Sequence, residues 1–156
     1  MELKLDTLDR QILKILENDA KTNAKDIASQ LNITKTPVYE RIRRLEKEGF
    51  ISKYVAILNR HKIESSITVF SFVSLEVQKG KMMDEFAENI KRYPEVVECF
   101  VVGGEFDFLL KIIVKDLDAY FKFSKDKVAS LAYIGTVKSA FVLNESKCTT
   151  NFPLLF

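Results

Sequence analysis

Hydrophobic residues in the first third of the chain recur at the spacing of an α-helix. In the stretch LDTLDRQILKILEND the apolar positions lie three or four residues apart, which places them along one side of a helix. Asp6 is predicted to be the N-cap of this helix, with Asp9 three residues further on. A second, shorter helix is predicted in NAKDIASQL, where Asn23 can cap the first turn.

A third helix is predicted within LNITKTPVYERIRRLEKEGFI, residues 31–51. Val38, Ile42 and Leu45 keep helical spacing on its inner side, and Gly49 suits the position just after its end. Two helices joined by a turn of three or four residues form a helix-turn-helix unit, whose second helix can lie in the major groove of DNA. The following FISKYVAIL is predicted to be β structure, forming a small wing or a connecting strand.

The basic character of the third helix has two interpretations, a solvated face or a face that binds DNA. With the apolar positions turned inward, the opposite side carries donors and acceptors long enough to reach base edges and phosphates. The candidate DNA-binding residues are Lys35, Thr36, Tyr39, Glu40, Arg43, Arg44 and Lys47. We expect Tyr39, Glu40 and Arg43 nearest the base edges and the others nearer the backbone. Three helices, a following strand and a basic third helix together favour DNA binding.

The hydrophobic period changes to two after the polar connection NRHKIESS, residues 59–66. A strand begins at Ile67, with Val69 and Val73 on one face and Phe70 and Phe72 on the other. A helix, two strands joined by a tight GGEF turn, a second helix and a last strand follow. The order β-α-β-β-α-β is that of the ferredoxin-like fold, so an α+β chain is predicted.

Two helices on one face of this sheet leave its other face uncovered. Phe70, Phe72, Leu109 and Ile113 are predicted to lie there, and a monomer rarely exposes so broad an apolar patch. A second copy packed against the patch gives a symmetric homodimer. The dimer also presents two helix-turn-helix units to two half-sites on double-stranded DNA.

Charge separates the two halves of the chain. The net charge of the 156 residues is only +2. Residues 1–63 contain 13 lysine and arginine residues against 9 aspartate and glutamate residues, a charge of +4, whereas the remainder contains 11 against 13, a charge of −2. The sign of this asymmetry makes the first half the candidate for a polyanionic partner.

The sequence shows no sign of a membrane or an oxidising environment. The charged N-terminus is unlike a signal peptide, and the longest uncharged run has 11 residues, where about 20 are needed to cross a bilayer. Cys99 and Cys148 form no C-x-x-C pair. We therefore expect a cytoplasmic protein without a membrane partner.

Catalysis is not expected from this set of residues. The only histidine, His61, lies in the polar connection and is predicted to be an exposed loop residue. The chain has no P-loop, no G-x-G-x-x-G and no metal-ligand spacing, and the GGEFD stretch joins two strands rather than opening a helix. We expect no catalytic residue, no metal site and no cofactor.

Two motifs carry a resemblance to a known family. These are R-x-x-x-L-E-x-x-G-x-I from Arg41 to Ile51 and G-x-x-D-x-L-L from Gly104 to Leu110. Over nearly its whole length the chain resembles the Lrp/AsnC (feast/famine) family of prokaryotic transcriptional regulators. The resemblance implies dimers that often assemble further, into octamers for example, and modulation by an amino acid or a related small molecule. It implies a winged helix-turn-helix domain at residues 1–58, a linker at 59–66 and a ferredoxin-like domain for ligand sensing and oligomerisation at 67–156.

The GGEFD turn has two interpretations. In the first, its glycines only let the chain reverse, and Asp107 faces solvent or caps a neighbouring amide. In the second, free backbone amides hold the carboxylate of an amino acid while Asp107 accepts a hydrogen bond from its ammonium group. The resemblance favours the second. The candidate effector-binding residues are Gly103, Gly104, Phe106, Asp107 and Ser139.

The chain also departs from the family pattern. Many members have a proline-glycine-valine turn before the last strand, where this chain has Ala132, Tyr133 and Ile134. Many members continue with two hydroxyl residues, where this chain has Val137 and Ser139. Either change can alter or remove effector binding, so an architectural protein that organises DNA without an effector is the alternative. The apolar tail NFPLLF is predicted to pack against a partner subunit or within the monomer.

Overall fold

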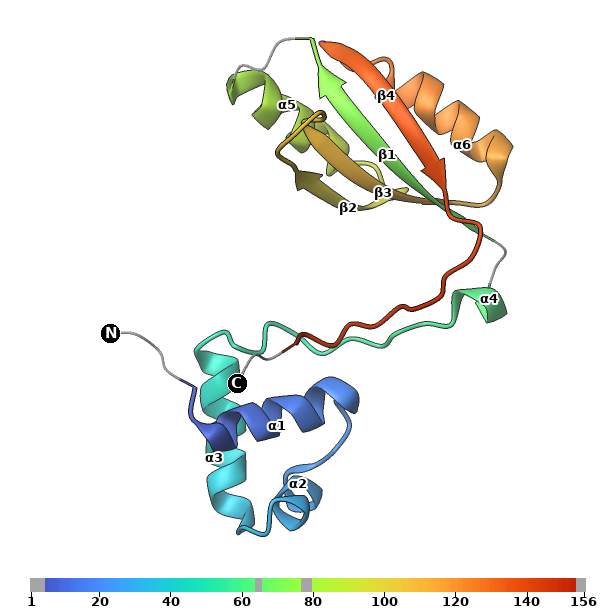
Figure 1. Ribbon diagram of the computed structural model, residues 1–156. Coiled ribbons are helices and arrows are strands. Elements are labelled where there is room, and N and C mark those ends of the chain that lie inside the picture. The colour runs from blue at the N-terminus through green and yellow to red at the C-terminus, as the bar shows by residue number, and fades with distance from the viewer. Residues whose placement is uncertain (1–4, 64–65, 77–79, 154–156) are drawn as a thin grey trace. The chain divides into compact units, whose positions relative to one another are not determined.

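The chain forms two compact units in the computed structural model, which describes residues 5–63, 66–76 and 80–153 (Figure 1). The first unit comprises the residues up to Ile57 together with those from Lys147 onward, and the second comprises Leu58–Ser146. No helix in the described part of the chain is long and apolar enough to cross a membrane.

The first unit is built from three helices, as the spacing of apolar residues predicts. They are α1 (Thr7–Asn18), α2 (Ala24–Gln30) and α3 (Lys35–Lys47). The predicted caps are confirmed: Asp6 and Asp9 form a reciprocal capping box on α1, and the side chain of Asn23 accepts two backbone N–H bonds at the start of α2. The buried core comprises Ile12, Leu16, Ile27, Ala28, Val38 and Leu45.

The turn between α2 and α3 fixes where α3 begins. Asn32 adopts a left-handed conformation with φ of 54°, and Ile33 then donates its N–H to the carbonyl of Ala28. Thr34 occupies the N-cap position of α3, and Gly49, with φ of 79°, follows its last turn. The helix-turn-helix prediction is therefore confirmed in its local geometry.

The β structure predicted for FISKYVAIL is wrong for this single chain. The described residues 50–58 form no strand, and their apolar side chains are largely exposed, reaching 74% for Ile57. A strand needs a neighbour to satisfy its backbone groups, and none of the described segments pairs with this one. The segment is attached to α3 by the Ile51 N–H, which donates to the carbonyl of Leu45 at 3.1 Å, and by the Tyr54 hydroxyl, which donates to Glu46 at 2.8 Å.

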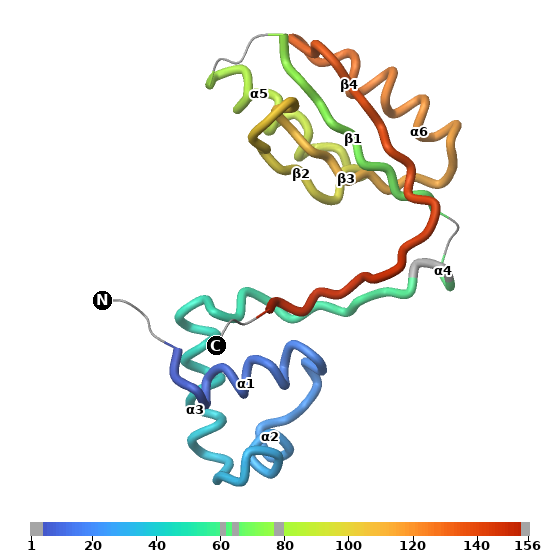
Figure 2. The backbone as a smooth tube through the Cα atoms, in the orientation of Figure 1, coloured from blue at the N-terminus to red at the C-terminus, as the bar shows by residue number. Residues whose placement is uncertain are grey.

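The end of the chain belongs to the first unit. The Asn151 side chain donates to the side chain of Asn18 on α1 at 3.0 Å, and the Phe152 N–H donates to the carboxylate of Glu17. The backbone tube in Figure 2 follows the chain out of the first unit and back into it. The predicted second domain, in contrast, extends to residue 156. Of the tail NFPLLF, the last three residues lie outside the described part.

The second unit has the predicted ferredoxin-like order of elements. After the short α4 (Arg60–Ile63) come β1 (Ile67–Leu75), α5 (Gly80–Ile90), β2 (Val96–Val101), β3 (Phe108–Val114), α6 (Leu117–Phe123), a π-helical turn (Ser124–Val128) and β4 (Ile134–Phe141). The sheet is antiparallel with the strand order β2-β3-β1-β4. This confirms the α+β fold class. The α4 helix lies in the predicted linker, and the side chain of His61 lies outside the described part of the chain.

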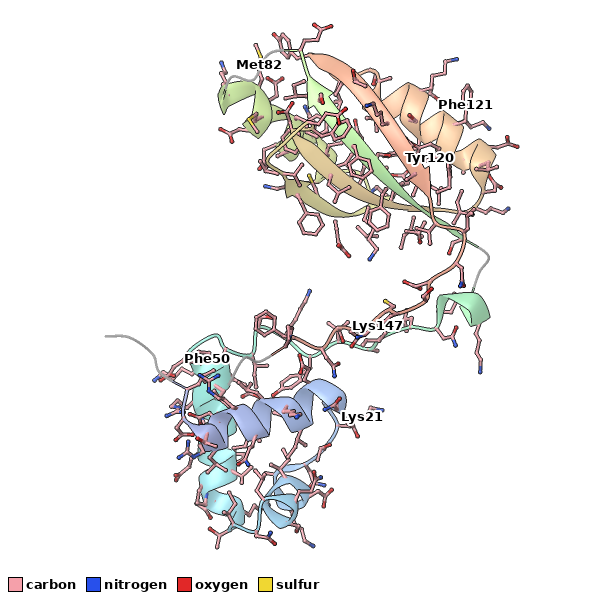
Figure 3. All side chains as sticks on the ribbon, viewed as in Figure 1. Lys21, Phe50, Met82, Tyr120, Phe121 and Lys147 are labelled. Carbon is pink, nitrogen blue, oxygen red and sulfur yellow. The ribbon has the colours of Figure 1, made fainter. Side chains whose placement is uncertain are left out.

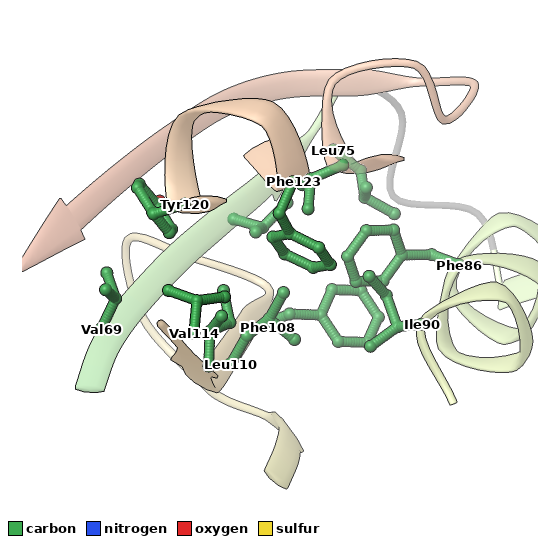
Figure 4. Close-up of a cluster of buried hydrophobic side chains, with 12 residues drawn as sticks. Val69, Leu75, Phe86, Ile90, Phe108, Leu110, Val114, Tyr120 and Phe123 are labelled. Atoms are coloured by element: carbon green, nitrogen blue, oxygen red, sulfur yellow. The ribbon is translucent and has the colours of Figure 1, made fainter. Parts of the chain in front are cut away.

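Both long helices cover the same face of the sheet. Alternate residues of β1 and β3 are buried beneath α5 and α6, and Figure 4 shows Phe86 of α5 and Phe123 of α6 beside Phe108 of β3. In Figure 3, Tyr120 lies against the sheet whereas Phe121, the next residue on α6, points away from it. The opposite face carries Phe70, Phe72, Leu109 and Ile113, each partly exposed in the single chain, as predicted.

Candidate functional site

The outward side of α3 is an exposed polar surface. All seven residues predicted to bind DNA are exposed on this helix, while Val38 and Leu45 are fully buried on the other side. The guanidinium of Arg43 lies 5.9 Å from the ring centre of Tyr39, one turn earlier. Tyr39, Glu40 and Arg43 therefore form a continuous patch that offers both donors and acceptors.

The beginning of α3 is suited to an anion. Thr34 makes no side-chain bond to the first-turn amides, and the first turn carries no acidic residue. Unsatisfied amides and the helix dipole attract negative charge at such an end. Lys35 and Thr36 lie exposed in this turn, so a DNA phosphate can meet amides, a hydroxyl and an ammonium group together.

Arg44 differs from the other predicted DNA-binding residues because its guanidinium is engaged within the unit. It lies 2.5 Å from the carboxylate of Asp9 and 3.9 Å from that of Glu48. Arg41, on the same side of α3, pairs with Asp9 at 2.7 Å and with Asp6 at 2.6 Å. The structure thus places Arg44 with Arg41 against the start of α1, rather than with the exposed patch.

This ion-pair network changes the acidity of its members. The N–H of Asp9, followed by the Arg41 guanidinium, holds the pKa of the Asp6 carboxyl below its ordinary value. Hydrogen bonds to Asp6 and Asp9 raise the pKa of Arg41. Both shifts favour the charged forms of Asp6 and Arg41.

The predicted effector turn has open space above its backbone, and its conformation requires glycine at one position. Gly104 has φ of 129°, a conformation that side-chain-bearing residues rarely adopt, and the space above Gly103 and Gly104 is empty of neighbouring atoms. Phe106 packs its ring 5.3 Å from that of Phe72. Both glycines therefore leave room for a ligand to approach the backbone.

A lysine from β4 covers this turn, which sequence reasoning did not anticipate. The ammonium of Lys138 lies 5.1 Å from the ring centre of Phe106 and donates to Glu105 at 2.7 Å. Lys138 pairs with Phe72 across the β1–β4 ladder, and this register of β4 against β1 places the lysine beside the turn. No local pattern in the sequence indicates such a register.

Asp107 is buried and caps a neighbouring amide, which was the first of its two interpretations. Its side chain accepts a hydrogen bond from the N–H of Leu75 at 2.8 Å, and the residue is 7% exposed. Its backbone N–H donates to Val73 and its carbonyl accepts from Val102. Asp107 thus joins the end of β1 to the turn.

Ser139 is not brought together with the turn. It pairs with Ser71, whose side chain is buried on the helix-covered face, and it hydrogen-bonds the hydroxyl of Tyr120 on α6. Ser71 also lies 3.0 Å from that hydroxyl. Phe106 packs on Phe72 at the opposite face, so the two predicted parts of the effector site lie on different sides of the sheet.

The residue at the position where the resemblance implies a turn glycine is conformationally unusual. Tyr133 has φ of 67°, its ring is exposed, and its carbonyl accepts a hydrogen bond from Glu76 at 2.9 Å. A Cβ at the nearby Gly135 would lie 3.2 Å from the carbonyl oxygen of Ser74. The start of β4 and the residue before it therefore run tightly against the end of β1.

Comparisons with known proteins cover both units. The family model described as winged helix-turn-helix DNA-binding matches residues 5–52, and the model described as Lrp/AsnC ligand binding domain matches residues 68–152. The Bkd operon transcriptional regulator of Pseudomonas aeruginosa is 35% identical over 97% of this chain and 99% of its own length. The leucine-responsive regulatory protein of Escherichia coli is 34% identical over 92% of this chain and 87% of its own.

Solved structures agree over the same range. An AsnC family transcriptional regulator from Agrobacterium tumefaciens has a TM-score of 0.90 and 35% identity, covering 96% of this chain and 97% of that one. A transcriptional regulator from Neisseria meningitidis, solved in complex with L-Met, has a TM-score of 0.91 and 29% identity, covering 97% of each chain.

Proposed function

Because this chain belongs to the Lrp/AsnC family of transcriptional regulators, we propose that it binds specific DNA sites and that an amino acid or a related small molecule modulates its assembly or its DNA affinity. The exposed patch of Tyr39, Glu40 and Arg43 on α3 carries the DNA-binding part of the proposal. It offers both donors and acceptors, which reading a base sequence requires.

The remaining DNA contacts are to the phosphate backbone. We assign them to Lys35 and Thr36, beside the open amides at the start of α3, and to Lys47 in its last turn. Arg44 is left out of this interface because Asp9 holds its guanidinium.

A second copy of the chain covers the open sheet face in this proposal. The partly exposed Phe70, Phe72, Leu109 and Ile113 form an apolar surface that a symmetric partner would bury. The resulting homodimer presents two copies of α3 to two half-sites. Dimers assembling further, to an octamer, would follow the family pattern.

The effector is proposed to bind at the β2–β3 turn. The open backbone of Gly103 and Gly104 can hold a carboxylate, and the ring of Phe106 can form one wall. Asp107 keeps the turn in place through Leu75, so its effect on the ligand is indirect. The L-Met bound by the Neisseria meningitidis relative supports an amino acid as the class of ligand.

Two measurements test the proposal. Selection from a random duplex library is expected to enrich a two-fold symmetric site, and failure to enrich any sequence would contradict specific binding. A thermal-shift screen of the twenty amino acids is expected to find one that raises the melting temperature, because a ligand of the native state stabilises it. The same ligand should change the dissociation constant for the selected site.

An effector-independent architectural protein is the second candidate. Tyr133 favours it, because a bulky ring with φ of 67° occupies the position of the family's turn glycine. If no amino acid raises the melting temperature while DNA binding is intact, the architectural function takes precedence.

A further inference from the structure

The start of α1 holds two arginines of the DNA-binding helix. Asp9 is 0% exposed, and its two carboxylate oxygens accept from different partners, Arg41 at 2.7 Å and Arg44 at 2.5 Å. Asp6 adds a second acceptor for Arg41 at 2.6 Å. Asp6, Asp9, Arg41 and Arg44 are called the arginine clamp below. Their formal charges sum to zero.

The other cations of α3 are arranged differently. Lys35, Arg43 and Lys47 are exposed, and none of them has an ion-pair partner among the residues that the structure describes. Arg43 rests on the ring of Tyr39. One helix therefore carries two classes of cation, those held by buried acid and those available to a ligand.

This division matters for DNA because non-specific affinity is electrostatic. Each cation that neutralises a phosphate steepens the dependence of log K on log salt by about 0.9 and strengthens binding to every sequence. Base contacts, in contrast, strengthen binding only to the preferred site. Holding two arginines away from the phosphates lowers affinity for all sequences by a similar factor and removes no base contact, so non-specific retention on DNA is limited while the ratio of specific to non-specific binding is unchanged.

A buried carboxylate is well suited to this task. An unpaired charge at a fully buried position is severely destabilising, so Asp9 retains its guanidinium partners when a polyanion approaches. Exposed ion pairs such as Lys91 with Glu88 lack this constraint, since both groups are solvated without each other.

We propose that Asp9 is a positioning residue for DNA binding, whose buried carboxylate keeps Arg41 and Arg44 off the DNA backbone and so limits sequence-independent affinity. The proposal rests on the DNA-binding function proposed above. It assigns sequence reading to the exposed patch and assigns to the clamp the restriction of phosphate contacts.

The test compares the full-length wild type with Asp9→Asn on the selected site and on an unrelated duplex over a salt series. Asp9→Asn keeps the side-chain shape and releases cationic charge. The salt slope is expected to steepen on both duplexes by about 0.9 to 1.8, the value for one or two added phosphate contacts, while the ratio of the two affinities stays near its wild-type value. A folded Asp9→Asn variant with the wild-type slope on both duplexes would overturn the proposal.

A double variant separates released charge from general damage. Asp9→Asn with Arg44→Gln lacks the released guanidinium of Arg44, so its slope is expected to return toward the wild-type value. A merely structural role of Asp9 predicts no such recovery. A double variant as steep as Asp9→Asn alone would therefore count against the clamp.

A further pair covers the case in which Asp9→Asn fails to fold. Arg44→Gln is expected to change the slope and the specificity ratio less than Arg43→Gln does, because only Arg43 lies in the exposed patch. An equal or larger effect of Arg44→Gln would refute the inference. A wild-type protein with no preferred site would instead overturn the DNA-binding proposal, together with this inference.

Discussion

Single side chains in this protein connect segments that are far apart in sequence. Asp107 fixes the start of β3 to the end of β1 by accepting one buried amide, and Asp9 fixes α3 to α1 by accepting two guanidinium groups. In both cases an acidic residue that looks available for a ligand is already used by the fold. The carboxylate's surroundings, rather than its chemistry, determine its role.

Asp107→Ala is expected to destabilise the second unit by about 1–3 kcal/mol. The change leaves the buried N–H of Leu75 without its acceptor, and an unsatisfied buried donor costs about that much. Urea unfolding measures the loss. Glu105→Ala, which removes an exposed ion pair in the same turn, is the matched control and should stay within about 0.5 kcal/mol of wild type.

The stability of the first unit should fall in acid partly because of Asp6. Its pKa is lowered in the folded state, so its contribution is present above the unfolded value of about 3.9 and is lost as pH falls through the folded value. The difference in melting temperature between wild type and Asp6→Asn should therefore shrink below about pH 4. A difference that stays constant from pH 7 to pH 3 would contradict this assignment.

Helices and strands can be predicted from the sequence where the pattern of buried residues alone determines their type and their inward face. The three helices and the two faces of β1 were predicted because periods of 3.6 and 2 record which side of an element meets the core. Residues 50–58 have a strand-like composition, but no strand in the described part of the chain pairs with them, and composition alone does not provide a pairing partner.

The contacts of the candidate residues that the sequence did not predict depend on distant pairing. Ser139 faces Tyr120 because β4 pairs with β1 in one register, and a shift of one residue would turn it to the other face. Arg44 meets Asp9 across 35 residues, a contact that no local pattern contains. The sequence thus suggests candidate residues, but it does not indicate which of them lie close together in the folded chain.

Within α3, Arg43 and Lys47 are expected to contribute differently to DNA binding. Arg43→Ala should cost about 1–3 kcal/mol at the preferred site and weaken discrimination, since it belongs to the patch assigned to base edges. Lys47→Ala should weaken binding to all sequences similarly and flatten the salt slope by about 0.9. Fluorescence anisotropy on matched and unrelated duplexes distinguishes the two, and identical behaviour of both variants would refute the assignment.

For the whole molecule, the uncovered sheet face predicts the assembly state. Phe72→Asp introduces a charge into the proposed dimer interface, where removing it from water is costly even beside Lys138, its cross-strand neighbour. Sedimentation should show monomers or unfolded chains, and DNA affinity should collapse because the two half-sites are no longer bound together. Phe121→Asp, on the 66% exposed outer side of α6, is the control and should leave the dimer intact. A wild-type chain that sediments as a monomer at micromolar concentration would contradict the premise.

The return of the chain to its first unit has a consequence for exchange between relatives. The N–H of Val142 donates to the carbonyl of Thr68, so the residues that follow β4 lie beside the beginning of β1. The second unit, Leu58–Ser146, is thus inserted between two segments of the first unit. Replacing the second unit by recombination needs two crossovers, one before β1 and one after β4, and neither interrupts the hydrogen-bonded sheet. Such a chimaera is expected to respond to the effector of the donor protein while binding the DNA site of the protein that supplies the first unit.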